Sequence, residues 1–255
     1  MTPYYADESV TLYRGDCREI VPGLVADGLT VDCIVADPPY GETSLAWDRW
    51  PDDWPTAISG AAKSMWCFGS MRMFLDRRDQ FVFWRLSQDV VWEKPSGTGF
   101  QADRFKRVHE LALHWYRGPW GDVRHEAQRE GVAVAARRPV TQGAKVGGIA
   151  HTGTIGQGNW VDNGTRLVAT VLHSRSMRGI SLHPTEKPVG ILDPLIRYAC
   201  PPGGTVLDPF AGSGSTAEAA RLTGRKAILV EADERYCDLI ARRMSQGVLI
   251  EDGPA

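Results

Sequence analysis

Short apolar runs alternate along the chain with segments in which apolar residues recur every three or four positions. The short runs are typical of buried strands, and the second pattern is typical of helices with one apolar face. Strands are expected at Thr11–Arg14, Val31–Ala36, Ser64–Gly69, Val90–Lys94, Glu110–Tyr116, Thr205–Asp208 and Lys226–Glu231. Helices are expected at Arg18–Leu24, Pro55–Lys63, Met71–Leu86, Val189–Ala199, Ala217–Thr223 and after an Asp233 cap. This alternation predicts an α/β fold, in which helices cover both faces of one sheet.

A proline and several aromatic residues add local expectations for two predicted helices and one loop. Pro194 lies inside a predicted helix and should kink it or shift its start. The loop 41–55 carries three tryptophans, so it either packs onto the core or closes over something flat, and the sequence leaves both open. The loop tryptophans are Trp47, Trp50 and Trp54. In the predicted helix 71–86, the expected core residues are Phe74, Phe81 and Trp84.

The overall composition, with 43% hydrophobic and 24% charged residues, is that of a soluble globular protein. No apolar run is long enough to span a bilayer, and the first residues lack the pattern of a signal peptide. The five cysteines are scattered and form no C-x-x-C pair, which favours free thiols in a reducing compartment over a zinc site or disulfides. We therefore expect a cytoplasmic protein.

Residues 119–178 differ from the rest of the chain in composition. They hold seven glycines between Gly143 and Gly164, and eight Lys or Arg residues against four acids, although the whole chain has a formal charge of −2. A basic, glycine-rich segment of this length is either a solvated flexible loop or a binding insertion. Any contact with nucleic acid must come from such a local basic patch.

Two predicted strands end in an acidic residue, proline and an aromatic ring: Asp37-Pro38-Pro39-Tyr40 and Asp208-Pro209-Phe210. Proline cannot donate a ladder hydrogen bond, so the backbone leaves the sheet with a constrained geometry. A carboxylate, backbone carbonyls and a ring then gather at the carboxyl end of a strand, where open α/β sheets bind ligands. The alternative is a plain turn whose Asp caps and whose Tyr packs, but the repeated pattern favours a site.

The segment Gly212-Ser213-Gly214-Ser215-Thr216-Ala217 follows the second of these strands and opens a predicted helix. Its glycines let the backbone approach a ligand, and Glu231, at the end of the next strand, suits two ribose hydroxyls. The spacing also fits a dinucleotide fingerprint, so a nicotinamide- or flavin-dependent oxidoreductase is the first rival. Asp208 beside the turn suits an ammonium group and would repel a pyrophosphate.

Three motifs together resemble the S-adenosylmethionine-dependent DNA amino-methyltransferases of the N6-adenine/N4-cytosine family. They are Asp37-Pro38-Pro39-Tyr40, His183-Pro184-Thr185-Glu186-Lys187-Pro188 and Asp208-Pro209-Phe210-Ala211-Gly212-Ser213-Gly214-Ser215. Their order resembles the β group, in which a target-recognition insertion separates the catalytic tetrapeptide from the glycine loop. Gly15-Asp16-Cys17, Trp92-Glu93-Lys94-Pro95 and Arg107-Val108-His109-Glu110 also fall where the pattern expects them, whereas Pro194 departs from it.

The resemblance implies a doubly wound, mostly parallel, Rossmann-like methyltransferase sheet with helices on both faces. Residues 1–118 would form the catalytic half of this core, 119–178 the target-recognition insertion, and 179–255 the cofactor-binding half. The insertion would contact double-stranded DNA. Its candidate DNA-binding residues are Arg137, Arg138 and Lys145.

The resemblance also assigns roles around S-adenosylmethionine. Glu231 would hold the ribose, Asp16 and Cys17 would lie by the adenine, and Lys187 would face the cofactor carboxylate. Asp37 would border both the cofactor and the target base. The methionine part would be wrapped by Asp208, Phe210, Ala211, Gly212, Ser213, Gly214, Ser215 and Thr216.

The expected reaction is methylation of an exocyclic amine, which is a poor nucleophile because its lone pair is delocalised into the ring. The Asp37 carboxylate and the Pro38 carbonyl would accept its two hydrogens, Pro39 would shape the turn, and Tyr40 would stack on a flipped base. No Pro-Cys dipeptide occurs, which speaks against carbon-5 cytosine methylation, and the chemistry needs no metal. Asp at the first motif position favours adenine N6, with cytosine N4 as the alternative.

Two further hypotheses remain at this level, the oxidoreductase and a non-catalytic DNA-binding relic of the family. The intact motifs disfavour the relic. The sequence leaves open a homodimer, a cognate restriction endonuclease and the recognition sequence.

Overall fold

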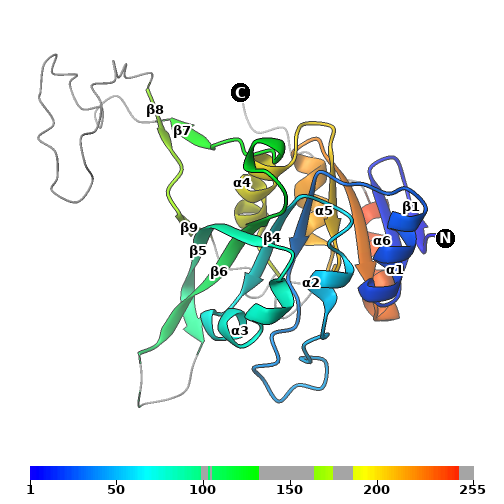
Figure 1. Ribbon diagram of the computed structural model, residues 1–255, viewed down its shortest axis with the longest axis horizontal. Coiled ribbons are helices and arrows are strands. Elements are labelled where there is room, and N and C mark those ends of the chain that lie inside the picture. Colours follow the sequence, from blue (N-terminus) through cyan, green and yellow to red (C-terminus); the bar gives the residue numbers. More distant parts are fainter. Residues whose placement is uncertain (99–102, 104, 132–163, 175–185, 247–255) are drawn as a thin grey trace, which may run out of the picture. The chain divides into compact units, whose positions relative to one another are not determined.

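A computed structural model describes residues 1–98, 103, 105–131, 164–174 and 186–246. Within these ranges the chain forms two compact units, one built from Met1–Glu126 and Thr170–Ala255 and the other from Ala127–Ala169. The larger unit contains a nine-stranded sheet with the order β1-β2-β11-β10-β3-β4-β6-β5-β9 (Figure 1). Its strands are β1 (Tyr5–Ala6), β2 (Val10–Arg14), β3 (Cys33–Ala36), β4 (Ser64–Gly69), β5 (Arg85–Thr98), β6 (Arg107–Tyr116), β9 (Val171–His173), β10 (Thr205–Asp208) and β11 (Lys226–Glu231). Its helices are α1 (Cys17–Ala26), α2 (Trp54–Ala57), α3 (Met71–Asp76), α4 (Val189–Ala199), α5 (Ser215–Leu222) and α6 (Glu234–Ser245), with 3₁₀ turns η1 (Arg78–Phe81) and η2 (Trp120–Asp122).

The centre of the sheet is parallel and reverses its winding direction between β3 and β10. From β3 the chain continues through α2 to β4 on one side, and from β10 through α5 to β11 on the other. β2, β11, β10, β3 and β4 run parallel, whereas β1, β6 and β5 add antiparallel pairings at the flanks. A reversal of this kind opens a crevice at the carboxyl ends of the two strands.

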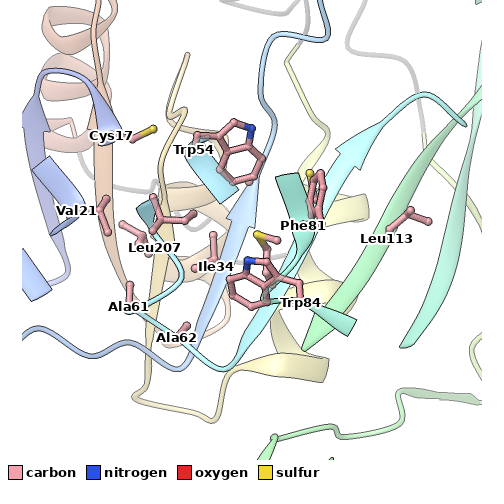
Figure 2. Packing of buried hydrophobic residues seen from close by; sticks show 14 of the residues in the cluster. Cys17, Val21, Ile34, Trp54, Ala61, Ala62, Phe81, Trp84, Leu113 and Leu207 are labelled. Carbon is pink, nitrogen blue, oxygen red and sulfur yellow. The ribbon is translucent and has the colours of Figure 1, made fainter. Parts of the chain in front are cut away.

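Helices cover both faces of the sheet, as the sequence predicts. On one face, α1, α2 and α3 pack against β3 and β4 through a cluster that includes Val21, Ile34 and Trp54 (Figure 2). On the other face, α4 packs against alternate residues of the same two strands, and α5 and α6 pack against β2 and β11. The apolar β3 and the largely apolar β4 are buried throughout because both of their faces are covered.

Two predicted helices are shorter than expected. Met71–Leu86 was expected to be one helix, but α3 ends at Asp76, a 3₁₀ turn follows, and β5 begins at Arg85. The long antiparallel pairing of β5 with β6 takes over the end of this segment, while Phe74, Phe81 and Trp84 are still buried. The expected helix Pro55–Lys63 is confined to α2, because the chain turns at Ile58 ahead of Ser59-Gly60.

The other predicted elements are confirmed. α4 spans Val189–Ala199 with Pro194 inside it, so the proline does not shift the start of the helix. Asp233 caps α6 by accepting a hydrogen bond from the Arg235 backbone. Trp50 and Trp54 pack into the core, whereas the Trp47 side chain is 50% exposed.

The smaller unit lies inside the expected insertion. There β7 (Arg129–Gly131) pairs antiparallel with β8 (Thr165–Leu167), and Arg166 forms an ion pair with Glu130 at 2.7 Å. Residues 171–173, which the sequence also assigned to the insertion, form β9 and pair with β5 in the large sheet. The boundaries 119 and 178 stay predictions, and Arg137, Arg138 and Lys145 lie outside the described residues.

All five cysteines are buried with free thiols, as the sequence predicts. They divide among the three apolar clusters: Cys17 and Cys67 in the first, Cys33 and Cys200 in the second, and Cys237 in the third. Within the described residues, no helix combines the length and the apolarity needed to cross a bilayer.

The Trp54 side chain should be one of the strongest contributors to stability, because it is fully buried against Trp50, Phe81 and Phe210. We expect Trp54→Ala to lower the free energy of unfolding by about 3–5 kcal/mol, measured by urea denaturation. The matched control, Trp47→Ala, removes a half-exposed ring and should cost much less. Equal losses in the two variants would contradict this packing.

Candidate functional site

The site lies where β3 and β10 end side by side at the same edge of the sheet. Cys33 pairs with Val206 and Ile34 with Leu207 in parallel register, so both chains leave the sheet at the winding reversal. A cavity of about 460 Å³ opens there. Its lining includes Asp16, Cys17, Asp37, Pro38, Pro39, Tyr40, Lys187, Asp208, Phe210, Ala211, Gly212, Ser213, Ser215, Thr216 and Glu231.

Asp37 and Tyr40 are linked to each other within the cavity. The Tyr40 hydroxyl lies 3.0 Å from Asp37 Oδ1, and Lys187 Nζ lies 2.5 Å from Asp37 Oδ2. The Asp37 side chain is 23% exposed, so the carboxylate still reaches the cavity. Burial raises the pKa of Asp37, and nearby Lys187 only partly opposes this. The tetrapeptide therefore presents an acceptor and an aromatic ring to one space.

A second carboxylate, that of Glu110 on β6, joins this group. It accepts a hydrogen bond from the Tyr40 hydroxyl at 2.7 Å and forms ion pairs with Lys94 at 3.0 Å and Lys187 at 3.7 Å. Burial alone would raise the pKa of Glu110, but Lys187, Lys94 and Tyr40 together lower it to about 2. Glu110 is therefore ionised at neutral pH.

The glycine loop folds back between β10 and α5. Gly212 and Gly214 have φ angles of 51° and 83°, a region that side chains rarely adopt. The surroundings of the two glycines differ. A Cβ on Gly212 would meet nothing closer than 4.0 Å, so its backbone borders open space, whereas one on Gly214 would press on Ile240 at 3.2 Å. Gly214 thus shapes the loop from behind and does not line the cavity.

Two buried acids flank this loop. Asp208 Oδ1 accepts from the Phe210 backbone at 2.9 Å, yet burial raises the pKa of Asp208 to about 7. The Glu231 carboxylate accepts from the backbone N–H groups of Gly212 and Asp233, both at 2.8 Å, and burial also raises its pKa. Each carboxylate oxygen has a second lone pair, so both acids retain acceptor capacity toward the cavity.

The start of α1 supplies another wall of the cavity. Asp16 caps α1 by accepting from the Arg18 backbone at 2.8 Å, and Arg18 pairs with its side chain at 2.6 Å. Cys17 is buried behind it, and burial raises the pKa of its thiol to about 12. Both residues line the cavity, but Asp16 already has a charged partner.

A DNA methylase family model matches residues 31–242 of the sequence. The chain belongs to the N6/N4 DNA methylase family. This match spans both strand ends and the intervening segment, so the oxidoreductase alternative is wrong. The methylase sheet described above is the α/β fold that the resemblance implied.

Among characterised proteins, this methylase is similar to the type II methyltransferase M.ScaI of Streptomyces caespitosus. The two are 25% identical over 262 residues, which cover 95% of this chain and 83% of the relative. The crystal structure of an M1.HpyAVI–SAM complex has a TM-score of 0.63 and 22% identity, covering 92% of this chain and 99% of that one. PvuII DNA methyltransferase, described as cytosine-N4-specific, has a TM-score of 0.60 and 16% identity, covering 99% and 90%. These structural likenesses support the fold.

Three contacts in the methylase site did not follow from the sequence. Glu110 was noted only as part of a short motif, although an acid opening an otherwise apolar stretch of β6 marks it out. Lys187 was expected to face a cofactor carboxylate, but its ammonium lies on Asp37, so that contact stays a prediction. Arg243 pairs with buried Glu186 at 2.9 Å and bonds the Ser213 carbonyl at 3.0 Å, and no sequence pattern signalled it.

The Asp208 pKa predicts a pH dependence of stability for the ligand-free protein. Because the folded-state pKa of about 7 exceeds the ordinary 3.8, the folded state binds more protons between these values. The stability that protonated Asp208 contributes is complete below about pH 3.8 and is lost as pH rises through about pH 7. Asp208→Asn should therefore stabilise the protein more at about pH 8 than at about pH 5, measured by urea denaturation. Asp89→Asn, at an exposed position, is the control, and an equal effect of Asp208→Asn at both pH values would contradict the assignment.

The Arg243 contacts predict a second effect on stability. Arg243→Met removes the guanidinium from a Glu186 side chain that is 2% exposed, so the free energy of unfolding should fall by about 3 kcal/mol. Arg242→Met alters the exposed neighbour on α6 and should change it by less than about 0.5 kcal/mol. Chemical denaturation that shows no difference between them would count against a structural role for the pair.

Proposed function

We propose that this methylase transfers a methyl group from S-adenosylmethionine to the exocyclic N6 amine of an adenine flipped out of double-stranded DNA. The observation that carries the proposal is the shared cavity, onto which both the Asp37 tetrapeptide and the glycine loop open. One strand end thus offers an amine acceptor where the neighbouring strand end offers a cofactor cradle.

The residues of the cavity fit S-adenosylmethionine. The open space at Gly212 allows a ligand to approach the loop backbone, and the buried acid Asp208 suits the ammonium of its methionine part. Glu231 would take the ribose hydroxyls, and Asp16 with Cys17 would border the adenine. When bound, this cofactor supplies a methyl group on a positively charged sulfur.

The protein contributes orientation and electrostatics to the transfer. The Asp37 carboxylate and the Pro38 carbonyl would accept the two hydrogens of the target amine, which favours a pyramidal nitrogen with its lone pair directed outward. Tyr40 would stack on the flipped base, a contact worth about 1–3 kcal/mol. The ionised Asp37 carboxylate is a stronger acceptor than the protonated form, so the rate should fall at acidic pH as its raised pKa is reached.

Adenine is preferred over cytosine because of the acid at position 37, since cytosine-N4 enzymes of the family more often carry Ser there. The hydrogen-bonding scheme itself serves either amine. Cytosine N4 is therefore the second candidate, and the identity of the methylated nucleoside decides between them.

The remaining expectations complete the proposal. Double-stranded DNA would be gripped by the basic insertion, with Arg137, Arg138 and Lys145 as its predicted contacts. Five buried thiols support a reducing, cytoplasmic setting. A homodimer and a cognate restriction endonuclease stay open and are tested by solution mass and by co-purification.

The catalytic assignment is tested with Asp37→Ala. Unmethylated DNA is incubated with enzyme and cofactor and digested to nucleosides, and the methylated species is identified by mass. The variant should lose on the order of 10²–10³-fold in kcat, because it lacks the acceptor that activates the amine, while cofactor binding measured by calorimetry persists.

Asp89→Ala, which removes an exposed carboxylate from β5, is the matched control and should retain full activity. Unchanged product formation by Asp37→Ala would refute the mechanism. Absence of both product and cofactor binding in the wild type would revive the non-catalytic alternative.

A further inference from the structure

The Glu110 side chain is 8% exposed and touches the catalytic tetrapeptide from a different strand. Its Oε1 accepts from the Tyr40 hydroxyl, and its Oε2 pairs with Lys94. A buried carboxylate is unfavourable unless it is compensated, so its place beside the cavity calls for an explanation.

The Tyr40 hydroxyl lies between two carboxylates but has only one proton to donate. It is 2.7 Å from Glu110 and 3.0 Å from Asp37, and the shorter distance favours Glu110 as the acceptor. The Tyr40 ring is thereby fixed by a group outside the tetrapeptide. The hydrogen bond from the Tyr40 hydroxyl to Asp37 is correspondingly weaker.

The Lys187 ammonium is shared in a similar way. Its Nζ lies 2.5 Å from Asp37 and 3.7 Å from Glu110, with a side chain that is 6% exposed. Lys94 compensates the far oxygen of Glu110 at 3.0 Å. Two carboxylates and two ammonium groups therefore form a cluster with no net charge. If the Glu110 charge were lost, Tyr40 would keep only its hydrogen bond to the Asp37 carboxylate among these contacts, and Lys187 would no longer share its charge with Glu110.

We propose that Glu110 is a positioning residue for methyl transfer, which holds the Tyr40 hydroxyl and shares Lys187 so that Asp37 retains acceptor capacity for the target amine. This inference rests on the function proposed above. Glu110 touches neither base nor cofactor in this scheme and acts only through Tyr40, Lys187 and Asp37.

The proposal makes a pH-dependent prediction with a definite sign. Asp37 is faced by Tyr40, by Lys187 and by Glu110, and its charge also acts on two more distant groups, the Cys67 thiol and the Asp208 carboxyl. Among these, Glu110 raises the pKa of Asp37 by repulsion. Removing that charge lowers the pKa of Asp37, so the acidic limb of the rate profile should move to lower pH.

The first test is Glu110→Gln, which keeps the shape of the side chain and removes its charge. The single-turnover methylation rate should fall on the order of 10²-fold while the KM for S-adenosylmethionine is unchanged, and the acidic limb should shift downward. Glu93→Gln is the matched control, because Glu93 pairs in register with His109 on the adjacent strand and is half exposed. It should leave both the rate and the acidic limb unaltered.

The second test is a double-mutant cycle with Tyr40→Phe, which keeps the stacking ring and removes only the hydroxyl. Because Glu110 acts partly through that hydroxyl, the two substitutions should be non-additive, with the double variant losing less than the product of the single losses. Glu110→Asp keeps the charge, so its acidic limb should stay at the wild-type pH. If Glu110→Gln does not fold, the cycle is not available, and the rate of Tyr40→Phe and the acidic limb of Glu110→Asp decide the question.

The outcomes separate this inference from the proposed function. A wild type that methylates neither adenine nor cytosine ends the proposed function. An active wild type with additive effects in the cycle, with full activity in Tyr40→Phe, or with a downward acidic limb in Glu110→Asp overturns the role of Glu110 alone. A folded Glu110→Gln variant with the wild-type rate and acidic limb does the same.

Discussion

The parallel pairing of β3 with β10 is the constraint on which the site depends. In this register Asp208 ends its strand opposite Val35, so Asp37 lies only two residues further along the neighbouring chain. At roughly 3.3 Å per residue, the two acids leave the sheet at nearly the same level. Residues separated by most of the chain are thereby brought to one cavity, because the winding of the sheet reverses between these two strands.

The same cavity concentrates charge, and the neighbours of each acid decide its state. Glu110 has two ammonium groups close by and a lowered pKa, whereas Asp37 shares one of them and is repelled by Glu110. Asp208 is held by backbone and Thr216 hydrogen bonds without a cation among the groups that shift its pKa, so burial prevails there. Carboxyl groups in one cavity thus differ in protonation for separate physical reasons.

Local sequence patterns predicted most of the fold and much of the cavity lining. Strand ends marked by Asp-Pro and a loop rich in glycine are local signals, and β3, β10 and α5 formed where these signals placed them. The failures arose where tertiary pairing overrode local spacing, as in Met71–Leu86, where β5 pairs with β6 at the end of a helical pattern.

The contacts of Glu110 and Arg243 were not predictable for a related reason. Each is a polar contact between elements that lie far apart in the sequence. The residue spacing within β6 or within α6 does not indicate which distant residue the side chain will contact. Motifs identified which residues gather at the cavity, but only the folded chain shows how Lys187 is divided between two acids.

The placement of the thiols gives the protein a set of built-in reporters. Cys33, Cys67, Cys200 and Cys237 lie in the three apolar clusters and do not line the cavity, so a sulfhydryl reagent in solution reacts with each of them only after the cluster around its sulfur has opened. Labelling rates measured for each cysteine would therefore distinguish local opening beside α4 or α6 from unfolding of the whole sheet. These native cysteines therefore report local opening of the protein without an engineered probe.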